Sequence, residues 1–344
     1  MFALKHVGED GQEHDFHIDE VEPLGFVALR DCLRDGRRSH PTQMHGRLYR
    51  DGKPSGERLK LTCSIEFNER VPFYGLVPGG ALPPMYLQGT TLVLDRNVVT
   101  SLKMADSPKR AEGAAECWLF SFLDSASNTV NPVLGAFEGK DNRTPTLEEF
   151  RIEVHDAAQA IQQRLPAVGL VSFSDDALRQ QHSWRQSFDK RAKPEAHFLR
   201  TVAPFLSNTV ATRQLEEVER KILGVANSCG LTRSCVVLAA LARLYASPDG
   251  TDYGVAQKLL KLTHSYSEEA AYNALADLRQ LELLAGSQGF STPVALLTGD
   301  KALALFWCGL GVQSVQVGAT RARFNLSPVA ELFPRVPAER LAGL

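Results

Sequence analysis

Two short apolar runs, far apart in the chain, each lead into an aspartate. The first runs from Leu92 to Leu94 and ends at Asp95, and the second runs from Val294 to Leu297 and ends at Asp300. An apolar run of this length, followed by a polar turn and a helix, is typical of a parallel strand with helices on both faces. Both aspartates then lie at the carboxyl ends of strands, where open α/β sheets bind ligands. The pattern predicts an α/β fold in which the two carboxylates converge.

The first part of the chain has a different pattern. Apolar and polar residues alternate from Leu59 to Phe67, which predicts a half-buried strand, and Asp51-Gly52 predicts a hairpin turn before it. The Pro- and Gly-rich stretch from Val77 to Met85 predicts a linker. We therefore expect a small β-rich accessory module over residues 1–88, followed by a second domain over residues 89–344.

Helical patterns fill most of the second domain. A helix is expected directly after Asp95, and Asn131-Pro132 starts another, with Asn as N-cap and Pro at the favoured first position. From about residue 146 to 265 the chain predicts a long helical insertion. Its expected breaks are at Pro166, at Lys193-Pro194 and near Gly230.

A late helix is expected to begin with Ser267 as its N-cap and to stop at Gly286. Asp277 in this helix lies one position away from an apolar stripe formed by Ala274, Leu278 and Leu281. A carboxylate so close to a buried stripe needs a partner, because an unpaired buried charge is costly. A metal ion is one such partner.

Composition narrows the function only slightly. The chain has 344 residues, 44% of them hydrophobic, and a formal net charge of -2, so it has no general attraction for nucleic acid. Its six cysteines show neither a CxxC pair nor a zinc-ligand spacing, which favours reduced thiols in the cytoplasm. No apolar stretch is long enough for a membrane span, and the first residues do not resemble a secretion signal. We expect a cytoplasmic protein with no membrane partner.

Four acids occur in an order and setting that is similar to the PIN-domain ribonucleases. The matching segments are Leu94-Asp95-Arg96-Asn97, Glu138 in a helix some forty residues later, Asp277 in the late helix, and Leu297-Thr298-Gly299-Asp300-Lys301. The resemblance covers about residues 90 to 320 and excludes the N-terminal module. It implies a parallel sheet flanked by helices, with the long insertion added.

The resemblance also implies a chemistry. Asp95, Glu138, Asp277 and Asp300 are expected to bind Mg²⁺ or Mn²⁺ and to hydrolyse phosphodiester bonds, in RNA more than in DNA. Hard divalent cations prefer such oxygen ligands, and they activate water and stabilise phosphate charge. Asn97 and Thr298 are expected to orient ligands or water from outside the metal, and Lys301 to contact phosphate.

One departure from the family pattern concerns the third acid. The gap between Glu138 and Asp277 is much longer than in small toxin-type members of the family. Asp252 is therefore the competitor of Asp277 for this position.

Each acid also has a purely structural interpretation. Asp95 and Asp300 both precede predicted helices, as N-caps do. Glu138 can be a surface charge, and Asp277 can form a salt bridge with a neighbour such as Arg279.

Two other functions stay open at the level of the sequence. Expected helices over residues 234–245, 253–262 and 267–285 resemble a winged helix-turn-helix, in which the last helix enters the DNA major groove. That helix, however, would begin with Glu268 and Glu269, which repel phosphate. The third class is a PIN-like scaffold that binds a protein partner without catalysis. The N-terminal module can equally be an oligomer edge, a partner surface or a lid.

Overall fold

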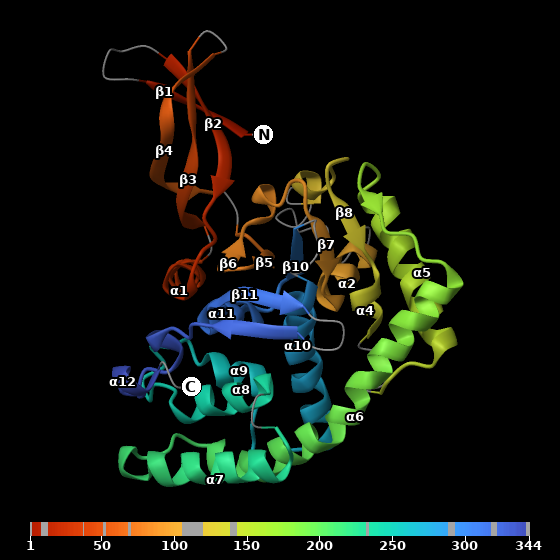
Figure 1. Ribbon diagram of the computed structural model, residues 1–344, viewed down its shortest axis with the longest axis vertical. Coiled ribbons are helices and arrows are strands. Elements are labelled where there is room, and N and C mark those ends of the chain that lie inside the picture. Colours follow the sequence, from red (N-terminus) through yellow and green to blue (C-terminus); the bar gives the residue numbers. More distant parts are fainter. Residues whose placement is uncertain are drawn as a thin grey trace.

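The computed structural model contains two main β-sheets, a two-stranded ribbon and a large group of helices (Figure 1). It describes residues 2–7, 13–36, 38–50, 53–67, 70–104, 120–137, 143–231, 234–287, 293–317 and 322–341.

The N-terminal sheet is an antiparallel meander that projects away from the helices (Figure 1). Its strands are β1 (Phe2–Val7), β2 (Glu13–Val21), β3 (Ser39–Arg50) and β4 (Lys53–Glu66). The predicted strand is confirmed as part of β4, and β3 and β4 form the predicted hairpin because Arg50 pairs with Lys53. The turn residues 51 and 52 lie outside the described residues.

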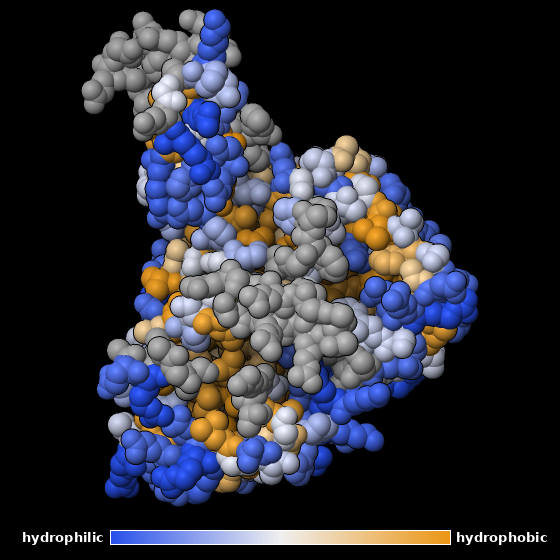
Figure 2. Space-filling model, in the orientation of Figure 1, coloured by the Kyte–Doolittle hydropathy of each residue, from blue (hydrophilic) through white to orange (hydrophobic). Residues whose placement is uncertain are grey.

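The face of this sheet that is seen in Figure 2 is mostly hydrophilic. Arg58 on β4 pairs with Asp19 and Glu20 on β2, and Lys60 pairs with Glu22. These exposed cross-strand pairs each add little stability, but they keep the face polar. The sheet has a small apolar cluster of its own, centred on Phe16, Ile18 and Met44.

A six-stranded mixed sheet forms the centre of the molecule, in the order β6-β5-β10-β7-β8-β9. Its parallel strands are β10 (Val294–Thr298), β7 (Thr91–Leu94), β8 (Thr129–Asn131) and β9 (Gly169–Leu170). The sheet is therefore parallel at its centre, as expected, but not throughout, since β5 joins β10 in the antiparallel direction.

Both apolar runs are buried strands, as predicted. Alternate residues of β10 point to different cores: Ala295 and Leu297 pack with helices α2 (Arg96–Met104) and α5 (Leu147–Arg164). Val294 and Leu296 pack on the other face, with α10 (Glu268–Ser287) and α11 (Lys301–Leu310). The near absence of polar residues in the run follows from this burial on both faces.

The predicted linker between residues 77 and 85 is wrong. β5 (Tyr74–Val77) and β6 (Gly80–Leu82) form a hairpin that extends the central sheet. Gly79 in the turn has a φ of 83°, and a Cβ on Gly80 would lie 2.2 Å from the carbonyl oxygen of Leu24. The glycines here permit a tight turn and a close backbone approach, rather than a break between domains.

Helix α1 (Phe26–Arg34) also belongs to the main body, because its apolar residues Phe26, Leu29, Cys32 and Leu33 lie in the large core. Leu24 and Ala81 exchange backbone hydrogen bonds of 2.8 and 3.0 Å directly before it. The β-rich module is thus the sheet β1–β4 alone. Elements before and after residue 88 together build the central body.

Helix α6 (Asp175–Leu206) corrects the prediction of a break at Lys193-Pro194, since it continues through Pro194 and Pro204. Tertiary packing holds the helix together there, because Phe198, Leu199 and Val202 are all fully buried after the first proline. Such packing outweighs the hydrogen bond that a proline removes. The expected break near Pro166 is confirmed, since α5 ends at Arg164.

The remaining helices pack below the sheet (Figure 1). They are α7 (Leu215–Ser228), α8 (Cys235–Leu244), α9 (Val255–Leu260) and the short α12 (Ala338–Leu341). The ribbon β11 (Val312–Val317) and β12 (Ala322–Leu326) follows α11, and α4 (Val133–Phe137) follows β8. The expected break near Gly230 is confirmed by the end of α7.

Helix α10 begins at the predicted N-cap, where the Ser267 hydroxyl accepts a hydrogen bond from the amide of Ala270. It contacts α6, α8, α9, α11 and β10, so it is a central helix with apolar neighbours on several sides. None of the helices in the described part of the chain combines the length and apolar content that a membrane crossing needs.

Candidate active site

Asp95 and Thr298 lie next to each other because both lie at the carboxyl ends of adjacent parallel strands. Leu94 at the end of β7 pairs with Leu297 on β10, and the amide of Asp95 donates to the carbonyl of Leu297 at 3.0 Å. The pairing brings together residues about 200 positions apart in the chain, at the sheet edge where α/β folds bind ligands. This is the convergence that the two apolar runs predict.

The Asp95 carboxylate is buried, with 5% of the residue exposed, and accepts side-chain hydrogen bonds from three directions. Its Oδ2 accepts from the Thr298 hydroxyl at 2.6 Å and from the Asn97 amide at 2.6 Å. Its Oδ1 accepts from the Gln280 amide at 3.2 Å. Charge-assisted bonds of this kind hold the carboxylate in one orientation.

A second set of bonds closes this network into a ring. Asn97 Oδ1 accepts from the amide of Gly299 at 3.3 Å, and the Thr298 hydroxyl accepts from the amide of Asp300 at 3.0 Å. Asn97 at the start of α2 and Thr298 at the end of β10 therefore connect Asp95 to the loop after β10. Their predicted role, to orient metal ligands or water, stays a prediction.

Asp300 is half-buried and has two oxygens with different surroundings. Its Oδ1 caps α11 by accepting from the amide of Leu303 at 2.9 Å, so the structural interpretation of Asp300 as an N-cap is correct. Among the hydrogen bonds of the described residues, its Oδ2 takes part in none. An N-cap role therefore leaves one oxygen of Asp300 available to a ligand.

The pKa of Asp95 is raised, mainly because burial disfavours the charged carboxylate, and the charge of Asp300 raises it further. The hydrogen bonds from Thr298 and Gln280 act in the opposite direction. Two carboxylates held close together in this way repel each other unless a cation lies between them.

The structure does not join the other two predicted acids to this pair within the part of the chain that it describes. Glu138 lies outside the described residues, directly after α4. Asp277 is half-buried on α10, and its charge adds to the burial that raises the pKa of Tyr266. Within the described ranges, no three His, Cys, Asp or Glu side chains come close enough together to hold a metal ion. The four-acid site thus stays a prediction.

Asp252, the competitor for the third acid, closes the loop between α8 and α9. Its Oδ1 accepts from the amide of Gly254 at 3.0 Å and its Oδ2 accepts from the amide of Ser247 at 3.3 Å. These bonds give it a structural role that accounts for its burial. Lys301 is exposed at the start of α11, directly after Asp300.

Gln280 is the site residue that the sequence did not indicate. It is 4% exposed and lies three residues, or nearly one turn, after Asp277 on α10. The only signal for it was a glutamine next to Leu281, and the helix carries many other polar residues. Because α10 is buried on several sides, a search for one apolar stripe did not separate this inward residue from the solvated ones.

The donor set of Asp95 and Asp300 fits a hard divalent cation. Mg²⁺ is commonly held by one or two carboxylates, with water and substrate phosphate oxygens completing its shell. The free Oδ2 of Asp300 and the carboxylate of Asp95 supply this set, and the longest bond to Asp95, from Gln280, is the one that a cation can replace most cheaply. A cation there would also relieve the repulsion between the two acids.

No model of a known protein family matches this chain, and no curated protein or solved structure matches it either.

Proposed function

We propose that this protein is a nuclease that uses Mg²⁺ or Mn²⁺ to hydrolyse phosphodiester bonds, in RNA rather than DNA. The observation that supports it most is the pair Asp95 and Asp300, which the ends of two adjacent parallel strands bring to one edge of the sheet. The preference for RNA comes from the resemblance to PIN-domain ribonucleases and from no single residue.

Each residue of the network has a part in this proposal. Asp95 and Asp300 hold the cation, while Thr298, Asn97 and Gln280 fix the orientation of Asp95. A divalent cation at this position supplies Lewis-acid stabilisation of the phosphate charge and lowers the pKa of a water molecule.

Three further residues complete the proposal. Lys301 contacts substrate phosphate from the start of α11. Glu138 and Asp277 are proposed to add oxygen ligands.

The winged-helix alternative fits the structure less well. A recognition helix must present one face to DNA, whereas α10 has buried residues along most of its length and packs against the sheet. The strand that follows it is β10, in the middle of the central sheet, rather than a basic wing.

A scaffold without catalysis also fits less well. Burying Asp95 beside a second acid costs stability, and binding a partner gives no reason for that cost.

The test is cleavage of labelled single-stranded RNA and single-stranded DNA with Mn²⁺, with Mg²⁺ and with EDTA. Asp300→Ser keeps an N-cap residue on α11 but removes the carboxylate, so the fold is expected to survive. We expect this variant to lose metal-dependent cleavage at least about a hundredfold, because even partners one shell away from a metal are worth about 10- to 100-fold.

Asp176→Asn is the matched control, since Asp176 is also an acid at the start of a helix but its side chain is 92% exposed and distant in sequence from the site. Its cleavage rate should equal that of the wild type. The nuclease proposal is abandoned if folded wild-type protein cuts neither nucleic acid with either metal, or if Asp300→Ser cuts as fast as the control.

A further inference from the structure

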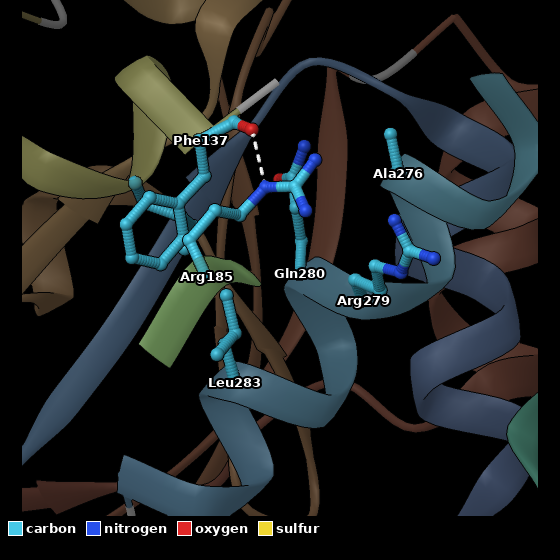
Figure 3. Close-up of a pocket in the computed structure, with 7 residues that line it drawn as sticks. Phe137, Arg185, Ala276, Arg279, Gln280 and Leu283 are labelled. Carbon is cyan, nitrogen blue, oxygen red and sulfur yellow. Dashed lines mark hydrogen bonds between the residues drawn. The ribbon is translucent and has the colours of Figure 1, made fainter. Parts of the chain in front are cut away.

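A small cleft opens between α4, α6 and α10 (Figure 3). Gln280 lines this cleft and donates to Asp95 at 3.2 Å, so one side chain reaches both places. The other elements contribute Phe137 from α4 and Arg185 from α6. Gln280 therefore links the cleft to the Asp95 carboxylate through one hydrogen bond.

The lining of the cleft combines positive charge with apolar surface. Arg185 and Arg279 supply two guanidinium groups, and none of the seven lining residues is acidic. Arg185 is 4% exposed, and its Nε donates to the carbonyl of Phe137 at 2.8 Å, which fixes the direction of its planar head (Figure 3). A guanidinium group held in place, as that of Arg185 is, suits the oxygens of a phosphate, while Arg279 pairs with Glu195 at 3.7 Å.

An exposed aromatic ring contacts Phe137, one of the residues that line the cleft. Trp184 on α6 is 47% exposed, and its ring contacts Phe137 edge-on, with ring centroids 6.0 Å apart. Phe137 in turn lines the cleft and stacks on Phe150. A rigid aromatic surface next to fixed positive charge is the arrangement with which proteins bind unpaired bases and the phosphates that join them.

We propose that the cleft binds one unpaired nucleotide of a single-stranded nucleic acid, with its base on Trp184 and its phosphate at Arg185 and Gln280. The proposal deepens the proposed nuclease function, on which it rests for the identity of the ligand. It assigns the substrate class as a flexible single strand, because a base inside a duplex is stacked between its neighbours and has no free face for the ring of Trp184. The strand then passes from the cleft to Asp95.

Binding without cleavage tests this assignment. Fluorescence anisotropy in EDTA measures the affinity for a labelled uridine decamer, a thymidine decamer and a duplex of the same length. We expect both single strands to bind more tightly than the duplex, and Trp184→Ala to weaken their binding about tenfold, in line with the loss of one stacked base. Trp184→Phe should retain most of the affinity.

A second variant fills the cleft without changing its charge. Ala276→Leu places a larger side chain among the lining residues and should also weaken single-strand binding. The matched controls are Asn273→Leu, exposed one turn earlier on α10, and Phe205→Ala, 39% exposed at the far end of α6. Neither control should change the affinity.

A change in tryptophan fluorescence on binding, present in the wild type and lost in Trp184→Phe, would place the base on this ring. The inference is overturned if neither single strand binds the wild type, if the duplex binds equally well, or if Trp184→Ala and Ala276→Leu both bind like the wild type. The ratio of the affinities for the uridine and thymidine decamers shows whether the cleft prefers RNA or DNA.

The two proposals fail separately in this design. If metal-dependent cleavage is unchanged by substitutions at Trp184 and Ala276, the nuclease proposal stands and the cleft proposal is wrong. If both substitutions weaken binding but the protein never cleaves nucleic acid, the cleft proposal stands and the nuclease proposal is wrong.

Discussion

Replacing Asp95 with asparagine is expected to stabilise the fold at neutral pH by about 1 kcal/mol while abolishing metal-dependent activity. Burial and the neighbouring Asp300 raise the pKa of the Asp95 carboxyl in the folded state. Folded protein therefore holds this proton more tightly than unfolded chain does. An uncharged amide removes the cost of burying the charge and can still accept hydrogen bonds from Thr298 and Asn97.

The pH dependence of this difference has a defined direction. Stability from a raised carboxyl pKa is fully present below the pKa of an unfolded aspartate, about 4, and is lost as the pH rises through the folded-state value. The wild type loses this stability as the pH rises to neutral, whereas Asp95→Asn has no carboxyl at position 95 to titrate. The advantage of the variant should thus be large at neutral pH and disappear towards about pH 4.

Calorimetry across this pH range, with and without Mn²⁺, measures both effects. Mn²⁺ should raise the melting temperature of the wild type but not of Asp95→Asn, since only a ligand that binds the folded state stabilises it. Thr298→Val is the contrasting variant, because it keeps the charge and removes a donor, and it should lose about 1–3 kcal/mol at neutral pH. A less stable Asp95→Asn at neutral pH would contradict the argument.

The sequence predicted the centre of the fold well because burial on two faces leaves a clear pattern. The runs before Asp95 and Asp300 contain almost no polar residues, and the structure places both in the middle of the sheet with helices on each side. Because β7 and β10 are adjacent parallel strands, their carboxyl ends bring the two acids close together. This part of the candidate site needed only the pattern of the chain.

Other features depended on long-range contacts that no local pattern reports. Neighbouring glycines such as Gly79 and Gly80 are common both in linkers and in tight hairpins. Here only the close approach to Leu24 shows that the segment is a hairpin. Pro194 lies inside α6 because buried residues on its C-terminal side hold the helix. Gln280 was missed for a related reason, since a helix surrounded by other elements has no single apolar stripe.

Substituting Arg279 by methionine is expected to cost about 3 kcal/mol of stability at neutral pH, because it leaves a buried carboxylate with less compensation. Glu195 on α6 is 3% exposed, and its carboxylate lies 3.7 Å from the guanidinium of Arg279 on α10. Ser234 donates a further hydrogen bond to Glu195 at 3.2 Å. These contacts join α6, α10 and the start of α8.

The cost of Arg279→Met should depend on pH in a way that a simple packing defect would not. Burial and the nearby Glu282 raise the pKa of Glu195, while Arg191 and Arg279 oppose this. Without Arg279 the pKa of Glu195 rises further, so the variant regains stability as the pH falls and Glu195 takes up its proton.

Denaturation of the variant at about pH 5 and about pH 7.5 measures the effect, with Glu195→Gln in the same background as the comparison. The double variant should be more stable than Arg279→Met at neutral pH, since it no longer buries a charge. An equal loss at both pH values, with no gain from Glu195→Gln, would show that Arg279 acts through its volume alone.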